Sequence, residues 1–199
     1  CQQMYMQPAL DIVSQTHPGM GRTHNEDSGA YDASCGLVVL ADGMGGHNAG
    51  EIASGITVSL ITSEIKHSLE SMRPEDRGEG GEDVGVGLLR EKVRKANDSI
   101  YHSSQSQPQY AGMGTTVVAG LFYDNRLAVA HVGDSRMYRL RGEIFESITR
   151  DHSLLQEQID RGMLSQKDAR LSKNKNLITR AVGVDPAVEA EIQVHAVQV

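Results

Sequence analysis

The sequence has no tryptophan, only two phenylalanines and only two cysteines. Two cysteines, Cys1 and Cys35, are too few for a disulfide framework, so we expect a reduced thiol at Cys35. No apolar run approaches the roughly 20 residues that a membrane-spanning helix needs. The first thirty residues also lack the basic start and apolar block of a signal peptide. These absences predict a cytoplasmic protein that does not enter the membrane.

Positive charge is scarce as well. The chain carries 19 lysines and arginines against 26 aspartates and glutamates, a net charge of -7. No general field for nucleic-acid binding is therefore expected, whereas a phosphoprotein or a metal ion remains a compatible partner. With 199 residues, the chain is long enough for one domain, 1–199, with a core built mainly from aliphatic side chains.

The hydrophobic pattern predicts strands and helices in blocks. Two helices are expected, from Gly50 to about His67 and from about Leu89 to Ile100. Between them, residues 71–87 are acidic and rich in glycine, which predicts a mobile loop. Helices paired between strand blocks favour an α+β fold in layers over βαβ alternation. Strands are predicted at 9–16, 36–41 (fully buried), 115–122, 126–133 and 137–140 (an antiparallel meander), 176–183 and 188–199.

Two short helices are expected within residues 151–182. Ser153 and Gln156 form a capping box for a helix that Gly162 ends, and Ser165 caps another. Asp151 and His152 are interpreted as a further cap of the first of these helices.

The segment VVLADGMGGH, 38–47, carries an acid at the end of an apolar run, then three glycines and a histidine. A carboxylate fixed at a strand end suits a hard metal ion, and glycines allow a bulky anion to approach the backbone. A dinucleotide fingerprint and a P-loop are both excluded, because their spacings are absent. Taken alone, Asp42 and Gly43 could equally form a simple turn.

Two further clusters favour phosphate chemistry. The loop RTHNEDS places Arg22 beside Glu26 and Asp27, and an arginine fork binds phosphate oxygens. Asp134, in HVGDSR, again follows an apolar strand and a glycine. The alternatives are surface ion pairs for the first cluster and a turn for the second. His131, inside a strand pattern, is interpreted as a core or turn histidine and not as a ligand.

Five segments occur in an order that resembles a known family, the bacterial metal-dependent serine/threonine protein phosphatases of type 2C. They are R-T-H-N-E-D-S, V-L-A-D-G-M-G-G-H, G-M-G-T-T-V-V, H-V-G-D-S-R and T-R-D-H-S-L, between about residues 10 and 184. Any one of them is weak, but five in order are specific. The resemblance implies an antiparallel β-sandwich flanked by helix pairs, and hydrolysis of phosphoserine or phosphothreonine by a metal-activated water.

The resemblance also implies the metal ligands. Asp42 would bridge two Mn²⁺ or Mg²⁺ ions, and the Gly43 carbonyl would hold one of them. Asp27 and Glu26 would act on that ion, partly through water. Asp134 would bind a third ion.

Two residues would act on the substrate. Arg22 would clamp the substrate phosphate, and His47 would protonate the leaving oxygen. Residues 151–182 resemble the flap beside the active site, which helps to choose phosphorylated protein substrates.

The family has a further C-terminal tail with two more metal-binding aspartates, which the sequence through Val199 does not include. We expect an incomplete copy of a longer active enzyme. The alternatives are a chain that borrows strands from a partner, and an inactive phosphatase-like binding or scaffold module. A metal phosphohydrolase acting on small molecules is a further hypothesis.

Overall fold

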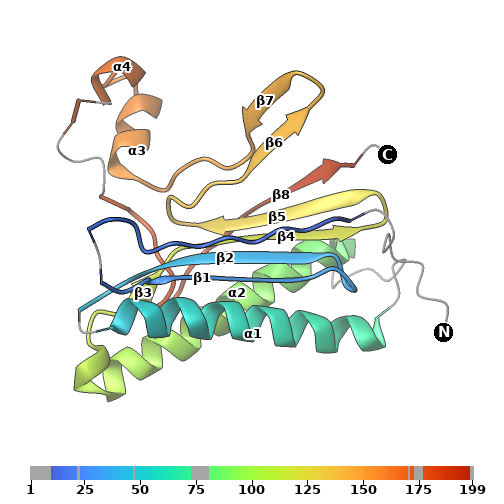
Figure 1. Cartoon of the computed structure of the whole chain (residues 1–199), viewed down its shortest axis with the longest axis horizontal. Coiled ribbons are helices and arrows are strands. Elements are labelled where there is room, and N and C mark those ends of the chain that lie inside the picture. Colours follow the sequence, from blue (N-terminus) through green and yellow to red (C-terminus); the bar gives the residue numbers. More distant parts are fainter. Residues whose placement is uncertain are drawn as a thin grey trace.

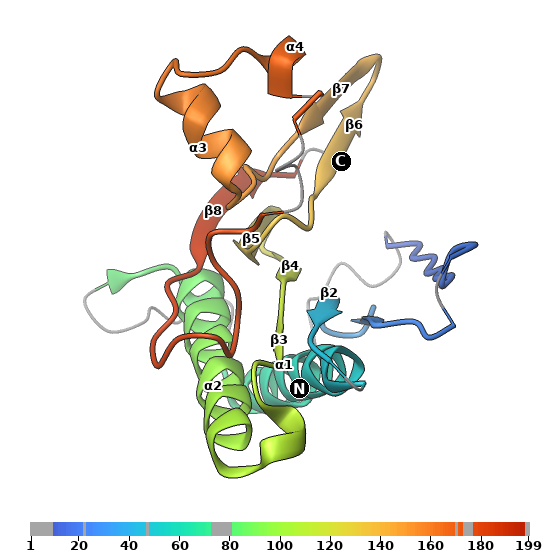
Figure 2. The ribbon, with the colours of Figure 1, turned by 90° about the vertical axis from the view of Figure 1, so that its left-hand side faces the viewer.

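The computed structural model describes residues 10–21, 23–46, 48–72, 81–169, 171–172 and 177–197. An antiparallel sheet in the order β1-β2-β4-β5-β8 forms its centre, and the short β3 pairs with β2. Two long helices, α1 and α2, lie against one face of the sheet (Figure 1). The hairpin β6–β7 and the short helices α3 and α4 lie on the other side (Figure 2). The elements are β1 (Asp27–Asp32), β2 (Leu37–Met44), α1 (Ala49–Ser71), α2 (Val84–Ser106), the 3₁₀ turn η3 (Pro108–Tyr110), β3 (Gly114–Thr115), β4 (Val117–Tyr123), β5 (Arg126–Val132), β6 (Tyr138–Arg141), β7 (Ile144–Ser147), α3 (Leu154–Asp160), α4 (Gln166–Ala169) and β8 (Glu191–Ala196).

The core lies between the sheet and the helix pair. Along β2, Leu37, Val39 and Ala41 are buried, whereas Leu40 is 45% exposed on the opposite face. Successive side chains of a strand point to opposite faces, so only one face of β2 packs on the helices. The prediction of a fully buried strand at 36–41 was therefore wrong, because an antiparallel sheet covered on one face gives alternation.

The helix pair is longer than the sequence pattern indicated. Helix α1 continues to Ser71, and α2 begins at Val84, so both ends of the predicted loop 71–87 are helical. Asp83 caps α2 by accepting hydrogen bonds from Gly85 N (3.0 Å) and Val86 N (3.4 Å). The same carboxylate binds Tyr123 and Arg126 of the β4–β5 hairpin. These polar contacts fix the start of α2, and a pattern of apolar residues cannot predict them. Residues 73–80 of the predicted loop lie outside the described residues.

Several strand predictions need correction. Residues 10–16 form no strand, although their side chains alternate, and β1 instead begins at Asp27, inside the segment predicted as a loop. Ladder hydrogen bonds need a neighbouring strand, and alternation alone does not supply one. The run 177–183 makes only isolated bridges, at Ile178 and Val182. Strand β6 pairs with β7 and not with β5, so the meander ends at β5.

Other predictions are confirmed. The α+β class with an antiparallel sheet and a helix pair is correct, and β5 and β8 form within the predicted ranges. Ser153 caps α3 by accepting from Gln156 N (3.2 Å), and Ser165 accepts from Asp168 N (3.1 Å) before α4. None of the helices within the described ranges combines the length and apolar character that crossing a bilayer requires.

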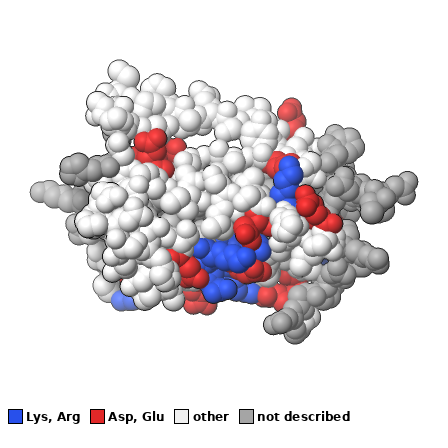
Figure 3. Space-filling model, turned by 90° about the horizontal axis from the view of Figure 1, so that it is seen from below, with Lys and Arg blue, Asp and Glu red and all other residues white. Residues whose placement is uncertain are grey.

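The outer surface of the helix pair carries charges of both signs (Figure 3). Lys92 and Lys95 of α2 both approach Glu64 of α1, at 3.4 and 2.9 Å. Glu91 lies 3.0 Å from Lys92. These ion pairs connect the two helices over the buried core. The charges on this surface are therefore explained by the packing of α1 on α2.

Candidate metal and phosphate site

Two acids face each other across the first strand pair. Asp27, the first residue of β1, is the direct register partner of Asp42 in β2. Both residues are exposed, on the sheet face opposite the helices. Facing residues in an antiparallel pair have Cβ atoms only about 5 Å apart, and like charges there destabilise the pair. A divalent cation between the carboxylates would remove that repulsion, and carboxylate oxygens are the donors that Mg²⁺ and Mn²⁺ take.

The backbone of Asp42 is held from the next strand. Its amide donates to Thr116 Oγ1 (3.1 Å), and its carbonyl accepts from Thr116 N (2.9 Å) and Thr115 Oγ1 (2.9 Å). Strand β2 continues through Met44, so Asp42 lies within the strand and not at its tip as predicted. This extension makes the carboxylate more rigid, because ladder bonds continue on both sides of it.

Asp134 comes to the same end of the sheet. Thr116 Oγ1, which binds Asp42, also lies 2.6 Å from Ser135 Oγ, the next residue after Asp134. Gly133 has φ +102°, and a Cβ there would lie 2.6 Å from Thr116 Cγ2. Asp134 is half-buried. Two acids predicted from separate motifs are thus joined through one threonine, a role that sequence reasoning missed although both threonines stand in G-M-G-T-T-V-V.

Gly43 and Glu26 have contacts that the sequence did not suggest. A Cβ on Gly43 would lie 2.0 Å from the carbonyl oxygen of Gly50, so β2 and α1 touch backbone to backbone. Gly43 N donates to Glu26 O (3.0 Å), which also accepts from Ser54 Oγ (2.6 Å). The Glu26 side chain lies against Gly50 in the first turn of α1, where the helix dipole favours a carboxylate. Glu26, Asp27 and Gly43 are thereby fixed beside Asp42.

Arg22 and His47, predicted to act on the substrate, lie outside the described residues. Gly45 and Gly46, which precede His47, are both exposed. A Cβ on Gly46 would have no neighbour within 4 Å, so open space lies beside the backbone there.

The segment 151–182, called the flap segment below, begins and ends at this site. At its start, Asp151 accepts two hydrogen bonds from Arg136, at 2.7 and 2.6 Å, and these raise the pKa of Arg136. His152 N donates to Gly133 O (2.9 Å), and Gly133 N donates to His152 Nδ1 (3.2 Å). The interpretation of Asp151 and His152 as helix caps was wrong, because Ser153 caps α3.

The far end of the flap segment binds Thr115 of β3, whose hydroxyl donates to the carbonyl of Asp42. Val182 N donates to Thr115 O (2.8 Å), and Thr115 N donates to Val182 O (3.0 Å). The two ends of the flap segment are therefore bonded to the backbone beside Asp134 and beside Asp42.

A second group of titratable side chains lies next to the first. One ligand atom from each of His131, His152 and Glu191 lies within 4.8 Å of the others. His131 is 2% exposed, which agrees with its interpretation as a buried histidine. Glu191 is its register partner in β8. Nothing in the sequence spacing predicts this group, because it depends on the pairing of β5 with β8.

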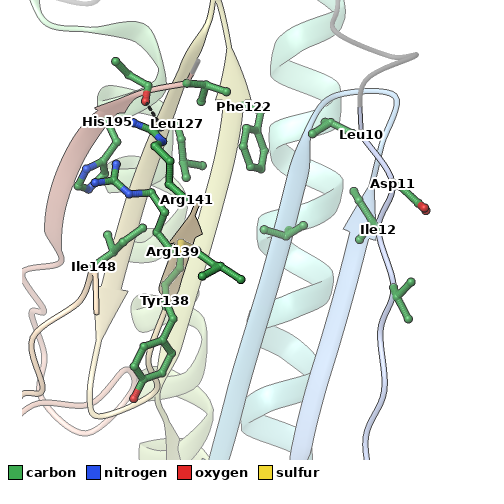
Figure 4. Close-up of a pocket in the computed structure, with 16 residues that line it drawn as sticks. Leu10, Asp11, Ile12, Phe122, Leu127, Tyr138, Arg139, Arg141, Ile148 and His195 are labelled. Carbon is green, nitrogen blue, oxygen red and sulfur yellow. Dashed lines mark hydrogen bonds between the residues drawn. The ribbon is translucent and has the colours of Figure 1, made fainter. Parts of the chain in front are cut away.

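An open groove lies at the opposite end of the same sheet face. This groove of about 640 Å³ is bordered by Val38, Phe122 and Leu127 and by the segment at Leu10 and Ile12 (Figure 4). Arg141 donates to Ala196 O (3.0 Å) along its edge. No acid of the candidate metal site lines it.

Comparison with known proteins identifies the family of the chain. The family model described as protein phosphatase 2C matches residues 20–172. The serine/threonine phosphatase stp of Listeria monocytogenes is 34% identical over 180 residues, which cover 89% of this chain and 68% of that protein. A crystal structure of the Mycobacterium tuberculosis serine/threonine phosphatase PstP/Ppp superposes with a TM-score of 0.80 at 33% identity, covering 92% of this chain and 72% of that one.

A further structure bears on the metal. The catalytic domain of PstP in complex with two manganese ions superposes with a TM-score of 0.76 at 33% identity, covering 92% of this chain and 71% of that one. The matched stretch 20–172 contains Asp27, Asp42, Asp134 and the start of the flap segment. The chain belongs to the protein phosphatase 2C family of metal-dependent serine/threonine phosphatases.

Proposed function

We propose that this chain removes phosphate from phosphoserine and phosphothreonine in proteins, and that Asp27, Asp42 and Asp134 hold its Mn²⁺ or Mg²⁺ ions. The observation that carries the proposal is the register of Asp27 opposite Asp42 on the exposed sheet face. Two carboxylates in this position favour a bound cation over an empty site. Thr116 Oγ1, which accepts from the Asp42 amide, also lies within hydrogen-bond distance of Ser135 Oγ, in the residue after Asp134.

The donor set fits a hard divalent ion. Asp27 and Asp42 come from two paired strands and Asp134 from a separate turn, so their carboxylate oxygens can approach bound ions from different sides. Within the described part of the chain, the Asp27 and Asp134 carboxylates have no side-chain hydrogen bond or ion pair that would compete with a metal. Glu26, whose backbone is bonded to Gly43, is proposed as an outer ligand acting through water.

When bound, Mn²⁺ or Mg²⁺ supplies Lewis acidity that lowers the pKa of a coordinated water and offsets charge on phosphoryl oxygens. The protein's own contribution is positioning. Thr115 and Thr116 fix the main chain of Asp42, so its carboxylate does not need to reorganise when the reaction begins.

Arg22 and His47 are proposed to act on the substrate itself. An arginine fork at Arg22 would hold two phosphoryl oxygens, and His47 would give a proton to the departing serine or threonine oxygen. The exposed Gly45 and Gly46 beside His47 leave the backbone open to a phosphorylated chain. Residues 151–182 are proposed as a flap that contacts the protein substrate, and a cytoplasmic location stays a prediction.

The proposal is tested with Asp42→Asn in the 199-residue chain. Mn²⁺-stimulated hydrolysis of p-nitrophenyl phosphate and of a phosphothreonine peptide should fall by about 100-fold or more, because one electrostatic ligand of the transition state is lost. The matched control is Asp124→Asn, which makes the same chemical change in the exposed β4–β5 turn and should keep full activity.

Retained activity in Asp42→Asn would overturn the site assignment. Nucleotides and sugar phosphates tested in parallel address the substrate class. Faster turnover of those small molecules than of the phosphopeptide would contradict a protein substrate.

A further inference from the structure

The turn that carries Asp134 is bonded on both of its peptide groups to one residue of the flap segment. Gly133 N donates to His152 Nδ1 (3.2 Å), and Gly133 O accepts from His152 N (2.9 Å). Gly133 directly precedes Asp134. The side chain and the backbone amide of His152 thus hold both polar groups of the Gly133 backbone, directly before Asp134.

The opposite side of the turn is equally restricted. A Cβ on Gly133 would lie 2.6 Å from Thr116 Cγ2, so the turn is packed closely against Thr116, which lies between β3 and β4. The adjacent Ser135 Oγ lies 2.6 Å from Thr116 Oγ1. The Gly133–Ser135 turn is therefore held between a threonine that also binds the Asp42 backbone and a histidine that belongs to the flap segment.

The His152 ring is itself fixed. It stacks on His131 with ring centroids 4.6 Å apart and planes inclined by 20°. His131 Nε2 in turn lies 2.7 Å from Arg150 O. The His152 side chain is 9% exposed. A ring clamped in this way presents Nδ1 to Gly133 in one orientation only.

The alternative is a metal site made of His131, His152 and Glu191. The hydrogen bond from Gly133 N occupies the Nδ1 lone pair, so the proton of the neutral ring lies on Nε2, which faces Glu191 Oε2 at 3.5 Å. The guanidinium of Arg180 also lies 3.5 Å from Nε2. A protonated nitrogen beside a fixed cation is unsuitable for a metal, so the group is a hydrogen-bonded support. Burial lowers the pKa of His152, with a further contribution from Arg180, which favours this neutral form.

We propose that His152 is a positioning residue: its Nδ1 and its main-chain amide hold the Gly133–Asp134 turn, so that the flap segment sets the affinity of the Asp134 metal site. The proposal rests on the proposed role of Asp134. It assigns to the start of the flap segment a task beyond substrate contact, since any movement of His152 is transmitted to the peptide before the acid.

Two variants separate the hydrogen bond from ring packing. In His152→Asn, Oδ1 stands the same number of bonds from the backbone as Nδ1 and can accept from Gly133 N. In His152→Phe, the ring and its stacking on His131 remain, but the acceptor is lost. Hydrogen exchange of the Gly133 amide, measured without metal, reports the bond directly.

The expected result is exchange of the Gly133 amide about five- to tenfold faster in His152→Phe than in wild type, the size expected for one hydrogen bond. The Mn²⁺ binding that Asp134→Asn removes should weaken by a similar factor in His152→Phe. His152→Asn should stay within about twofold of wild type in both measurements.

Other outcomes overturn the proposal. Equal amide exchange and equal Mn²⁺ binding in His152→Asn and His152→Phe would show that the hydrogen-bond acceptor at residue 152 does not hold the turn. Faster exchange with unchanged Mn²⁺ binding would refute the link to Asp134. If Asp134→Asn itself leaves Mn²⁺ binding intact, the metal role of Asp134 fails, and the metal-free exchange still shows whether the hydrogen bond exists.

A measurement on the unmutated chain needs no variant to fold. The ¹⁵N spectrum of His152 should show a proton on Nε2 and an accepting lone pair on Nδ1. A proton on Nδ1 at neutral pH would overturn the proposal.

Discussion

Strand β1 has an aspartate at each end, and the two carboxylates have opposite surroundings. Asp27 faces another acid, Asp42, across the ladder. Asp32 accepts hydrogen bonds from Ser34 and from Lys66 (3.0 Å), which lower its pKa to about 2. The same residue type in the same strand is neutralised by the protein at one end and set against a like charge at the other. The contrast supports the proposed role of Asp27 in binding a cation, whereas the Asp32 carboxylate is already neutralised by Ser34 and Lys66.

The two ends of the whole sheet also differ, in this case in how they are packed. At the acid end, β2 approaches α1 through the backbone of Gly43 and Gly50, and it is hydrogen-bonded to the hydroxyl of Thr116, which lies between β3 and β4. At the other end, the outer face is an apolar groove beside Phe122 and Leu127. Polar, closely packed backbone is thus found at the end of the sheet that is proposed to bind metal and phosphate.

The largest effect should come from adding one carbon at the acid end. In Gly43→Ala, the new Cβ would lie 2.0 Å from Gly50 O and 2.8 Å from Glu26 O, both backbone atoms that cannot rotate away. We expect a loss of about 3 kcal/mol in the free energy of unfolding, measured with urea. The control Gly55→Ala, in α1 with nothing within 4 Å, should gain up to about 1 kcal/mol. Wild-type stability in Gly43→Ala would show that the close contact is absent.

The next effect distinguishes the two aspartates of β1 directly. Without metal, Asp27→Asn should raise the free energy of unfolding by about 0.5 kcal/mol, because it removes the repulsion from Asp42. Mn²⁺ at a hundred times its dissociation constant should stabilise wild type by about 2.7 kcal/mol. Asp27→Asn should lose most of that gain, whereas Asp32→Asn should keep it. Thermal unfolding with EDTA and with Mn²⁺ measures both, and equal responses of the two variants would break the contrast.

The smallest effect concerns Asp32 and pH. Its pKa is lowered from 3.8 to about 2 in the folded chain, first by the hydrogen bond from Ser34 and then by Lys66. The resulting stability is present above about pH 4 and is lost as the pH falls toward 2. Lys66 is about half exposed, so the contribution should stay below about 1 kcal/mol. Urea unfolding at pH 5 and pH 3 should show a smaller difference for Asp32→Asn than for wild type; an identical difference would contradict the assignment.

Motifs singled out the acids that the structure brings to one end of the sheet, whereas hydrophobic patterns missed one of the strands there. Asp42 and Asp134 each follow an apolar run and stand beside a glycine, and such short-range signals survive in a single sequence. Strand β1, with the sequence DSGAYD, was missed because it contains few apolar residues and depends on β2 for its hydrogen bonds. Its register, which sets Asp27 opposite Asp42, is a property of two segments and is absent from either one.

The contacts of Asp151, His152 and Gly43 could not be predicted from the sequence for a related reason. Asp151 and His152 were read as a local cap, yet they bind Arg136 and Gly133 across the β6–β7 hairpin. Gly43 was expected only to hold a metal ion through its carbonyl, and its contact with Gly50 follows once α1 packs on β2. Local rules find caps and turns, whereas contacts between distant segments follow from topology.

Backbone hydrogen bonds join the two ends of the flap segment to each other. Thr179 N donates to His152 O (2.8 Å), and Leu154 N donates to Leu177 O (2.9 Å). Because residues 152–154 are bonded to residues 177–179, residues between them can be inserted, deleted or exchanged without altering the spacing of Asp27, Asp42 and Asp134. Sequence changes in this stretch should therefore leave the proposed metal-binding acids in place.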